Sequence, residues 1–100
     1  MSKIMTIEEF EKIQREYKEA ESKVLIQRHS DYGPYNIARC PAGPLVGINV
    51  RMWDKLSRAS YIIENSLEPK SESLFDSYLD LANYGTIASM VLDKIWPGIQ

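Results

Sequence analysis

Apolar residues recur at spacings of three and four along most of this 100-residue chain, which is the pattern of amphipathic helices. The spacings predict three helices, over about residues 7–28, 46–65 and 71–95. Thr6 begins a capping-box pattern, because its hydroxyl can accept a hydrogen bond from the amide of Glu9. Ser71 and Ser73 are both plausible N-caps of the third helix, which Pro97-Gly98 would end. No strand pattern occurs, so the sequence predicts an all-α protein, a small bundle of three main helices.

Residues 29–45 interrupt the helical pattern with turn-forming residues, including Gly33-Pro34 and Gly43-Pro44. A stretch of this length without regular structure is uncommon inside a compact domain and is often functional. Because Tyr32 and Tyr35 within it are residues that pack, we expect a long ordered loop rather than a flexible linker.

The third predicted helix carries two stripes. The first is apolar and predicts a core-facing side: Leu74, Tyr78, Leu81, Gly85, Ala88, Leu92 and Ile95. Gly85 costs about 1 kcal/mol relative to Ala inside a helix, so it predicts close approach by another helix. The second stripe begins with polar residues and ends with apolar ones: Glu72, Asp76, Asp80, Asn83, Ile87 and Val91. Such a face predicts the acidic end of a partly buried cleft.

The second predicted helix also combines charged residues with an apolar end on one face, which holds Arg51, Asp54, Lys55, Arg58 and Ile62. Its opposite side is expected to be core and holds Met52, Trp53, Leu56 and Ile63. Packed antiparallel, the two helices would place carboxylates opposite guanidinium and ammonium groups. This arrangement suits a ligand site in which Mg²⁺ or basic residues compensate the carboxylates. The alternative is a structural layer of salt bridges between Arg51 or Arg58 of one helix and Asp76 or Asp80 of the other. Because buried ion networks are costly to assemble, the ligand site is the more attractive interpretation.

Composition narrows the class of protein. Apolar residues make up 44% of the chain and charged residues 26%, as in a globular protein, and the length predicts a single domain over residues 1–100. Twelve basic and fourteen acidic residues give a net charge of −2, without the basic surplus of proteins that bind nucleic-acid duplexes. The single cysteine, Cys40, excludes an internal disulfide, and no stretch is apolar enough for a signal core or a membrane span. We therefore expect a soluble cytoplasmic protein with no membrane partner.

Three segments resemble one protein family. They are residues 29–37, residues 50–58 with the sequence Val-Arg-Met-Trp-Asp-Lys-Leu-Ser-Arg, and residues 72–84, which end in Asp-Leu-Ala-Asn-Tyr. Together they are similar to the nucleotide-modification-associated, MazG-like proteins of phages and bacteria. The resemblance implies an all-α nucleoside triphosphate pyrophosphohydrolase fold in a bacterial cell or phage-infected host. In that family, carboxylates from two helices bind Mg²⁺, and attack at the α-phosphate releases a nucleoside monophosphate and pyrophosphate.

The resemblance also implies roles for individual residues. The metal ligands would be Asp54, Glu72, Asp76 and Asp80, with Asp54 and Asp80 as the catalytic pair. The phosphates would contact Arg51, Lys55 and Arg58. His29, Tyr32 and Asn36 of the loop would contact the base or sugar, and Asn83 would also contact the substrate. The family's Glu-Glu-x-x-Glu helix is absent, and Ser77 stands where its Glu-x-x-Asp motif begins.

Two other interpretations stay open on the sequence alone. With fewer carboxylates than the family uses, the chain could be a non-catalytic protein that sequesters a signalling nucleotide, such as an anti-defence protein of a phage. It could also be an interaction module whose charged layer is purely structural. In addition, we expect a homodimer or higher oligomer with sites completed near the interface, because three helices cover the cleft thinly and Leu25 and Ile26 look exposed.

Overall fold

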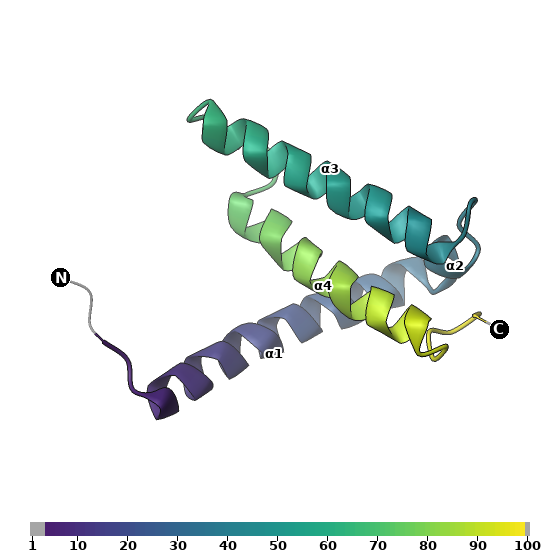
Figure 1. Ribbon diagram of the computed structural model, residues 1–100, viewed down its shortest axis with the longest axis horizontal. Helices are drawn as coiled ribbons and strands as arrows, with labels where there is room; N and C mark the ends of the chain where they lie inside the picture. Colours follow the sequence, from purple (N-terminus) through teal and green to yellow (C-terminus); the bar gives the residue numbers. More distant parts are fainter. Residues whose placement is uncertain (1–3, 100) are drawn as a thin grey trace.

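The computed structural model describes residues 4–99 and contains four helices. They are α1 (Ile7–Tyr32), α2 (Tyr35–Ala38), α3 (Pro44–Glu64) and α4 (Leu74–Leu92), and the described residues include no strand (Figure 1). The predicted all-α class with three main helices is therefore confirmed. Across residues 4–99, no helix is both long enough and apolar enough to cross a membrane.

Side-chain caps fix the starts of α1 and α4. The Thr6 hydroxyl oxygen accepts a hydrogen bond from the Glu9 N–H at 3.1 Å, as the capping pattern predicts. The Ser73 hydroxyl oxygen accepts one from the Asp76 N–H at 3.0 Å. Of the two serines proposed as N-caps, Ser73 therefore caps α4 and Ser71 lies before the helix.

The predicted loop over 29–45 is shorter than expected, because helices extend into both of its ends. α1 continues to Tyr32 and stops at Gly33, whose φ of 69° is a left-handed conformation that glycine adopts at low cost. α2 forms directly afterwards, and α3 begins at Pro44. The remaining connections are short turns.

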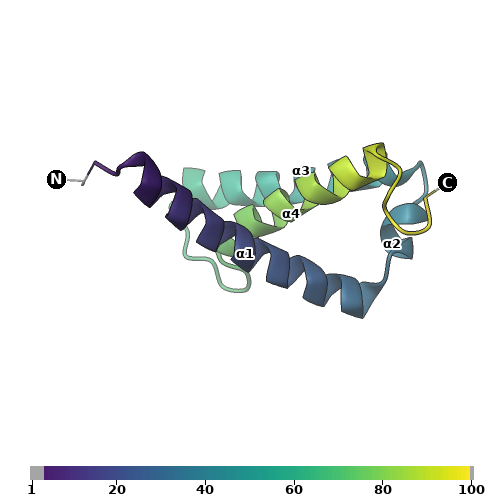
Figure 2. The ribbon, with the colours of Figure 1, turned by 90° about the horizontal axis from the view of Figure 1, so that it is seen from below.

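The helices form a flat molecule. α3 and α4 lie side by side and antiparallel, and α1 crosses α4 on one side of this pair (Figure 1 and Figure 2). The molecule extends 51 × 36 × 22 Å. Its smallest dimension equals about two helix diameters, since a helix with its side chains is about 10–12 Å across. No helix of the described chain covers the side of the α3–α4 pair that faces away from α1.

The buried core lies at the end of the molecule where α2 and the segment after α4 meet the long helices. Its buried residues are Ile37, Ile48, Ile87, Val91 and Trp96. The Trp96 indole N–H donates a hydrogen bond to the Pro34 carbonyl oxygen at 3.1 Å. This bond fixes the segment after α4 against the start of α2.

The predictions of which helix faces form the core are largely wrong. On α4 the apolar stripe is partly exposed, at Tyr78 and Leu92. The buried side holds Asp80, Asn83, Ile87 and Val91 of the mixed stripe together with Ser77, whereas Asp76 of that stripe is exposed. On α3, Trp53, Leu56 and Ile63 are exposed, and only Met52 of the predicted core side packs against the core. The buried residues of α3 are Ile48, Ala59 and Ile62.

The reversal has a physical reason. Buried polar groups are tolerated when each finds a partner, so a stripe that contains Asp80 can face inward once cations reach it from other helices. Part of the predicted charged pairing is present: Lys55 and Arg58 of α3 lie opposite Glu72 and Asp80.

Candidate functional site

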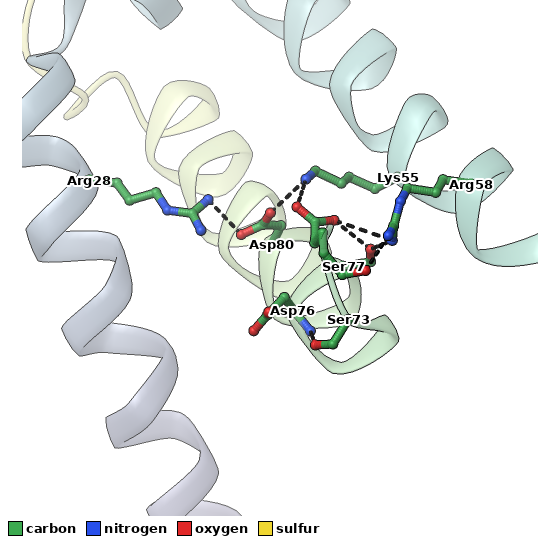
Figure 3. Close-up of polar contacts among 8 residues, drawn as sticks. Arg28, Lys55, Arg58, Ser73, Asp76, Ser77 and Asp80 are labelled. Atoms are coloured by element: carbon green, nitrogen blue, oxygen red, sulfur yellow. Dashed lines mark hydrogen bonds and ion pairs between the residues drawn. The ribbon is translucent and has the colours of Figure 1, made fainter. Parts of the chain in front are cut away.

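Charged side chains lie between α3 and α4 and form what we call the polar layer. At its centre is Asp80, which is only 3% exposed. Its Oδ1 accepts a hydrogen bond from Arg28 Nη1 of α1 at 2.7 Å, and its Oδ2 lies 2.8 Å from Lys55 Nζ of α3 (Figure 3). An isolated charge at this depth would be very costly, and the two cations offset that cost. Asp80 therefore connects all three long helices.

Glu72, just before α4, completes the layer. Its Oε1 lies 2.6 Å from Lys55 Nζ, and its Oε2 accepts a hydrogen bond from the Ser77 hydroxyl at 2.6 Å. Arg58 donates to Ser77 Oγ at 2.8 Å and to the Glu72 carbonyl oxygen, and its Nη1 lies 3.6 Å from Glu72 Oε2. The layer thus pairs two carboxylates with the side chains of Arg28, Lys55 and Arg58, which leaves one positive charge in excess.

These contacts shift two pKa values in opposite directions. Partial burial alone would lower the pKa of Lys55, but hydrogen bonds to Asp80 and Glu72 outweigh it and raise this pKa above the ordinary 10.5. The hydrogen bond from Lys55, followed by that from Ser77, lowers the pKa of Glu72 below the ordinary 4.5. Both groups are therefore held in their charged forms at neutral pH.

Three residues predicted for the site lie outside this layer. Asp54 and Asp76 are exposed, and the Asp76 carboxylate points away from Asp80 and Lys55 (Figure 3). Arg51 instead donates a hydrogen bond to the backbone carbonyl of Asn36 at 3.1 Å. In the part of the chain that the structure describes, no group of three or more His, Cys, Asp or Glu side chains could hold a metal ion. The four carboxylates predicted as Mg²⁺ ligands therefore do not converge within one chain.

Four other predicted residues do come together. One pocket of about 70 Å³ between α1, α2 and α4 is lined by four residues predicted to bind the substrate: His29, Tyr32, Asn36 and Asn83. Arg28, Tyr84 and Trp96 complete its polar and aromatic lining, and the buried Asp80 forms part of its wall. This volume exceeds that of a few water molecules, since about 10–15 Å³ suffices for each. The pocket can accept a small ring or the edge of a larger one.

His29 has an unsatisfied nitrogen at this pocket. Its ring meets the Trp96 ring edge to face, with 5.1 Å between centroids and 77° between planes. Nδ1 is buried and has no hydrogen-bond partner among residues 4–99. Leaving such a group unpaired costs about 1–3 kcal/mol, so a water molecule or a ligand atom is expected there.

Sequence reasoning missed Arg28 and Trp96. Arg28 shares one face of α1 with Glu21, Leu25 and Tyr32, at spacings of four and three, and this face turns toward α4. The spacing alone could have placed Arg28 on the inner side of α1. Its partner Asp80 lies 52 residues away, and no local pattern connects the two.

Comparisons with known proteins match nothing to this chain: no family model, no curated protein and no solved structure. The resemblance to MazG-like proteins therefore stays a prediction from three sequence segments.

Proposed function

We propose that this protein binds a nucleotide in the pocket between α1, α2 and α4 and retains it without hydrolysis. The observation that carries this proposal is the convergence of aromatic, amide and cationic side chains on one pocket, from positions as far apart as His29 and Trp96. Aromatic side chains stack on bases with about 1–3 kcal/mol per base, and guanidinium groups bind phosphate through paired hydrogen bonds.

Arg28 is the best-placed phosphate ligand. Half of its side chain is exposed, and its contact with Asp80 uses Nη1. Because a guanidinium carries five N–H donors, others remain for a phosphate at the pocket mouth. Lys55 and Arg58, which the resemblance assigns to phosphates, do not line the pocket and are engaged in the layer between α3 and α4.

Polar groups inside the pocket would orient the base. The Asn83 side-chain amide donates to the Glu21 carbonyl oxygen at 3.0 Å, so its own carbonyl oxygen is left to accept from a ligand N–H. His29 Nδ1 offers a second buried polar contact. Pockets for drug-sized ligands measure about 300–1,000 Å³, so this smaller pocket would hold only part of a nucleotide. The rest would lie across the exposed Tyr32 ring.

The carboxylates favour retention over hydrolysis. Mg²⁺ needs oxygen ligands grouped around one point, whereas Asp80 and Glu72 are paired with cations and Asp54 and Asp76 are exposed and outside the layer. The ligand set of a single chain does not fit the ion. Mg²⁺-dependent pyrophosphohydrolysis stays a prediction, and nucleotide titrations with and without Mg²⁺ separate it from retention.

Isothermal titration with a panel of nucleoside mono-, di- and triphosphates, in Mg²⁺ and in chelator, tests the proposal. We expect binding in both conditions and intact nucleotide when the mixture is separated by ion-exchange chromatography. Tyr32→Ala should weaken binding at least fivefold, since about 1 kcal/mol of stacking corresponds to that factor. The matched control is Tyr61→Ala, a ring of similar exposure (63% against 69%) on α3 outside the pocket.

Each contrary outcome has a definite meaning. Release of monophosphate and pyrophosphate only with Mg²⁺ would establish the hydrolase instead. The pocket assignment would be refuted if no nucleotide of the panel bound. It would also be refuted if Tyr32→Ala and Tyr61→Ala weakened nucleotide binding equally.

A further inference from the structure

The side of the α3–α4 pair that faces away from α1 is apolar and uncovered. We call it the open face, and its main residues are Trp53, Leu56 and Ile63 of α3 with Gly85 and Leu92 of α4. Trp53 is 68% exposed and Leu92 66%. On α3, Leu56 and Ile63 each lie one position after an inward residue, Lys55 and Ile62, and on α4 Leu92 lies one position after the buried Val91. Because the helices are antiparallel, that offset turns both stripes to the same side of the pair.

Gly85 gives an independent indication of a missing neighbour. A glycine inside a helix costs about 1 kcal/mol relative to alanine, and such a residue usually has a packing reason. A Cβ atom built at Gly85 would meet nothing within 4 Å. The described chain therefore holds no close contact that would account for this glycine, although the sequence predicts approach by another helix.

The accessible surface is also larger than is usual for a folded monomer of this mass. A folded monomer of 11.5 kDa exposes about 5,800 Å² by the usual scaling with mass, whereas this chain exposes 7736 Å². The excess is roughly 1,900 Å² per chain. If each of two copies buried half of its excess, the interface would remove about 1,900 Å² in total, within the range of about 1,200–2,000 Å² for stable complexes. Only half of the excess surface is assigned to the interface, because part of it lies on the projecting start of α1.

We propose that a second copy of this chain docks on the open face, so that two α3–α4 pairs pack face to face. The residues that define the open face, Trp53, Leu56 and Ile63 on α3 with Gly85 and Leu92 on α4, are all uncharged. Two copies of net charge −2 can therefore meet there without placing like charges together. Burial of Trp53 and Leu92 would supply the driving force.

This surface differs from the one expected near Leu25 and Ile26. Leu25 packs against the core, so that expectation is wrong for Leu25, and only Ile26 is strongly exposed. The open face and the nucleotide pocket lie on different sides of α4, so the dimer and the proposed binding function can fail independently.

Light scattering coupled to gel filtration at micromolar concentration tests the proposal. Wild type should give about 23 kDa, twice the chain mass of 11.5 kDa, and Trp53→Glu and Gly85→Glu should each give half of that. Gly85→Glu improves helix propensity in a monomer, so its loss of dimer would not result from unfolding. Ile26→Glu is the matched control and should remain dimeric.

A second measurement locates the interface in the unmodified protein. Trp96 is 5% exposed, so acrylamide quenching of tryptophan fluorescence reports mainly on Trp53. Quenching should be weak in the dimer and should increase on dilution to monomer. A wild type of 11.5 kDa would overturn the proposal and leave the open face to a different partner. A dimer in which acrylamide quenches Trp53 strongly would also overturn the proposal. So would a dimer that Ile26→Glu dissociates while Trp53→Glu and Gly85→Glu do not.

Discussion

At the residue scale, Asp80 illustrates what a sequence can and cannot reveal. Its place on a stripe that turns apolar at Ile87 predicts a partly buried carboxylate, and the structure buries it. The same stripe does not identify the positive charge that compensates Asp80, because Arg28 and Lys55 belong to other helices. A metal ion and a pair of basic side chains satisfy the same local pattern. Only tertiary contacts distinguish them.

Replacing Asp80 should therefore destabilise the fold to the same extent with and without Mg²⁺. Asp80→Asn keeps the shape and removes the charge that both Arg28 and Lys55 contact. Removing one member of a buried pair costs about 3–5 kcal/mol, and the lower end is expected because Lys55 keeps Glu72 and Arg28 reaches solvent. Urea unfolding in MgCl₂ and in chelator measures the effect.

The matched control for Asp80→Asn is Asp76→Asn, which removes an exposed carboxylate one turn earlier on α4 and should cost at most about 1 kcal/mol through the helix dipole. If wild type gains stability from Mg²⁺ and Asp80→Asn abolishes that gain, Asp80 is a metal ligand and its role as the partner of Arg28 and Lys55 alone is refuted.

Glu72 should make the fold sensitive to acid. Because the hydrogen bond from Lys55 lowers the pKa of Glu72 in the folded state, its stabilisation is complete above the unfolded value near 4.5 and is lost as pH falls through the lower folded value. Glu72→Gln should lower the melting temperature at neutral pH, and the two melting curves should converge in acid. Circular-dichroism melts across this range test the expectation. Glu68→Gln, in the same α3–α4 connection, should instead keep the wild-type profile, and a constant offset for Glu72→Gln would contradict the argument.

At the element scale, capping residues are more informative than apolar stripes. Thr6 places the start of α1, and the stop of α1 at Gly33 reflects backbone conformation rather than hydrophobicity. The predicted core faces are wrong because α4 has two stripes that could both be buried. Hydrophobicity alone favours burial of the purely apolar stripe. The mixed stripe is buried instead, because its Asp80 has a charged partner on α3. The Arg28 contact and the position of Trp96 depend on packing between distant segments, which helical spacing does not encode.

The cap of α4 gives a prediction at this scale. Ser73→Ala removes the oxygen that accepts from the Asp76 N–H and should destabilise the protein by about 1 kcal/mol, which lowers the melting temperature by about 4–8 °C in a domain of this size. Ser71→Ala is the natural comparison, since both serines satisfy the sequence pattern. It should melt within error of wild type, and equal losses in the two variants would show that the cap is shared.

At the scale of the whole molecule, the single chain is flatter and less compact than is usual for its length. Its radius of gyration is 16.0 Å, whereas about 13 Å is usual for 100 residues, and its core lies at one end rather than along the α3–α4 pair. A single layer of paired helices with α1 on one side leaves the other side to solvent. A second copy on the open face would enclose apolar side chains between two layers and place Gly85 against a neighbour.

Stability should therefore depend on protein concentration. If folding and docking on the open face are coupled, each tenfold dilution removes about 1.4 kcal/mol per dimer, which corresponds to a fall of about 3–5 °C in melting temperature. Melts over three decades of concentration, followed by circular dichroism, measure this slope. Gly85→Glu should melt at a temperature independent of concentration, because it unfolds as a monomer, whereas Ile26→Glu should keep the wild-type slope. A wild-type melting temperature that stays constant over the same range would mean that one chain is stable alone, and that the exposed Trp53 and Leu92 contribute nothing to folding.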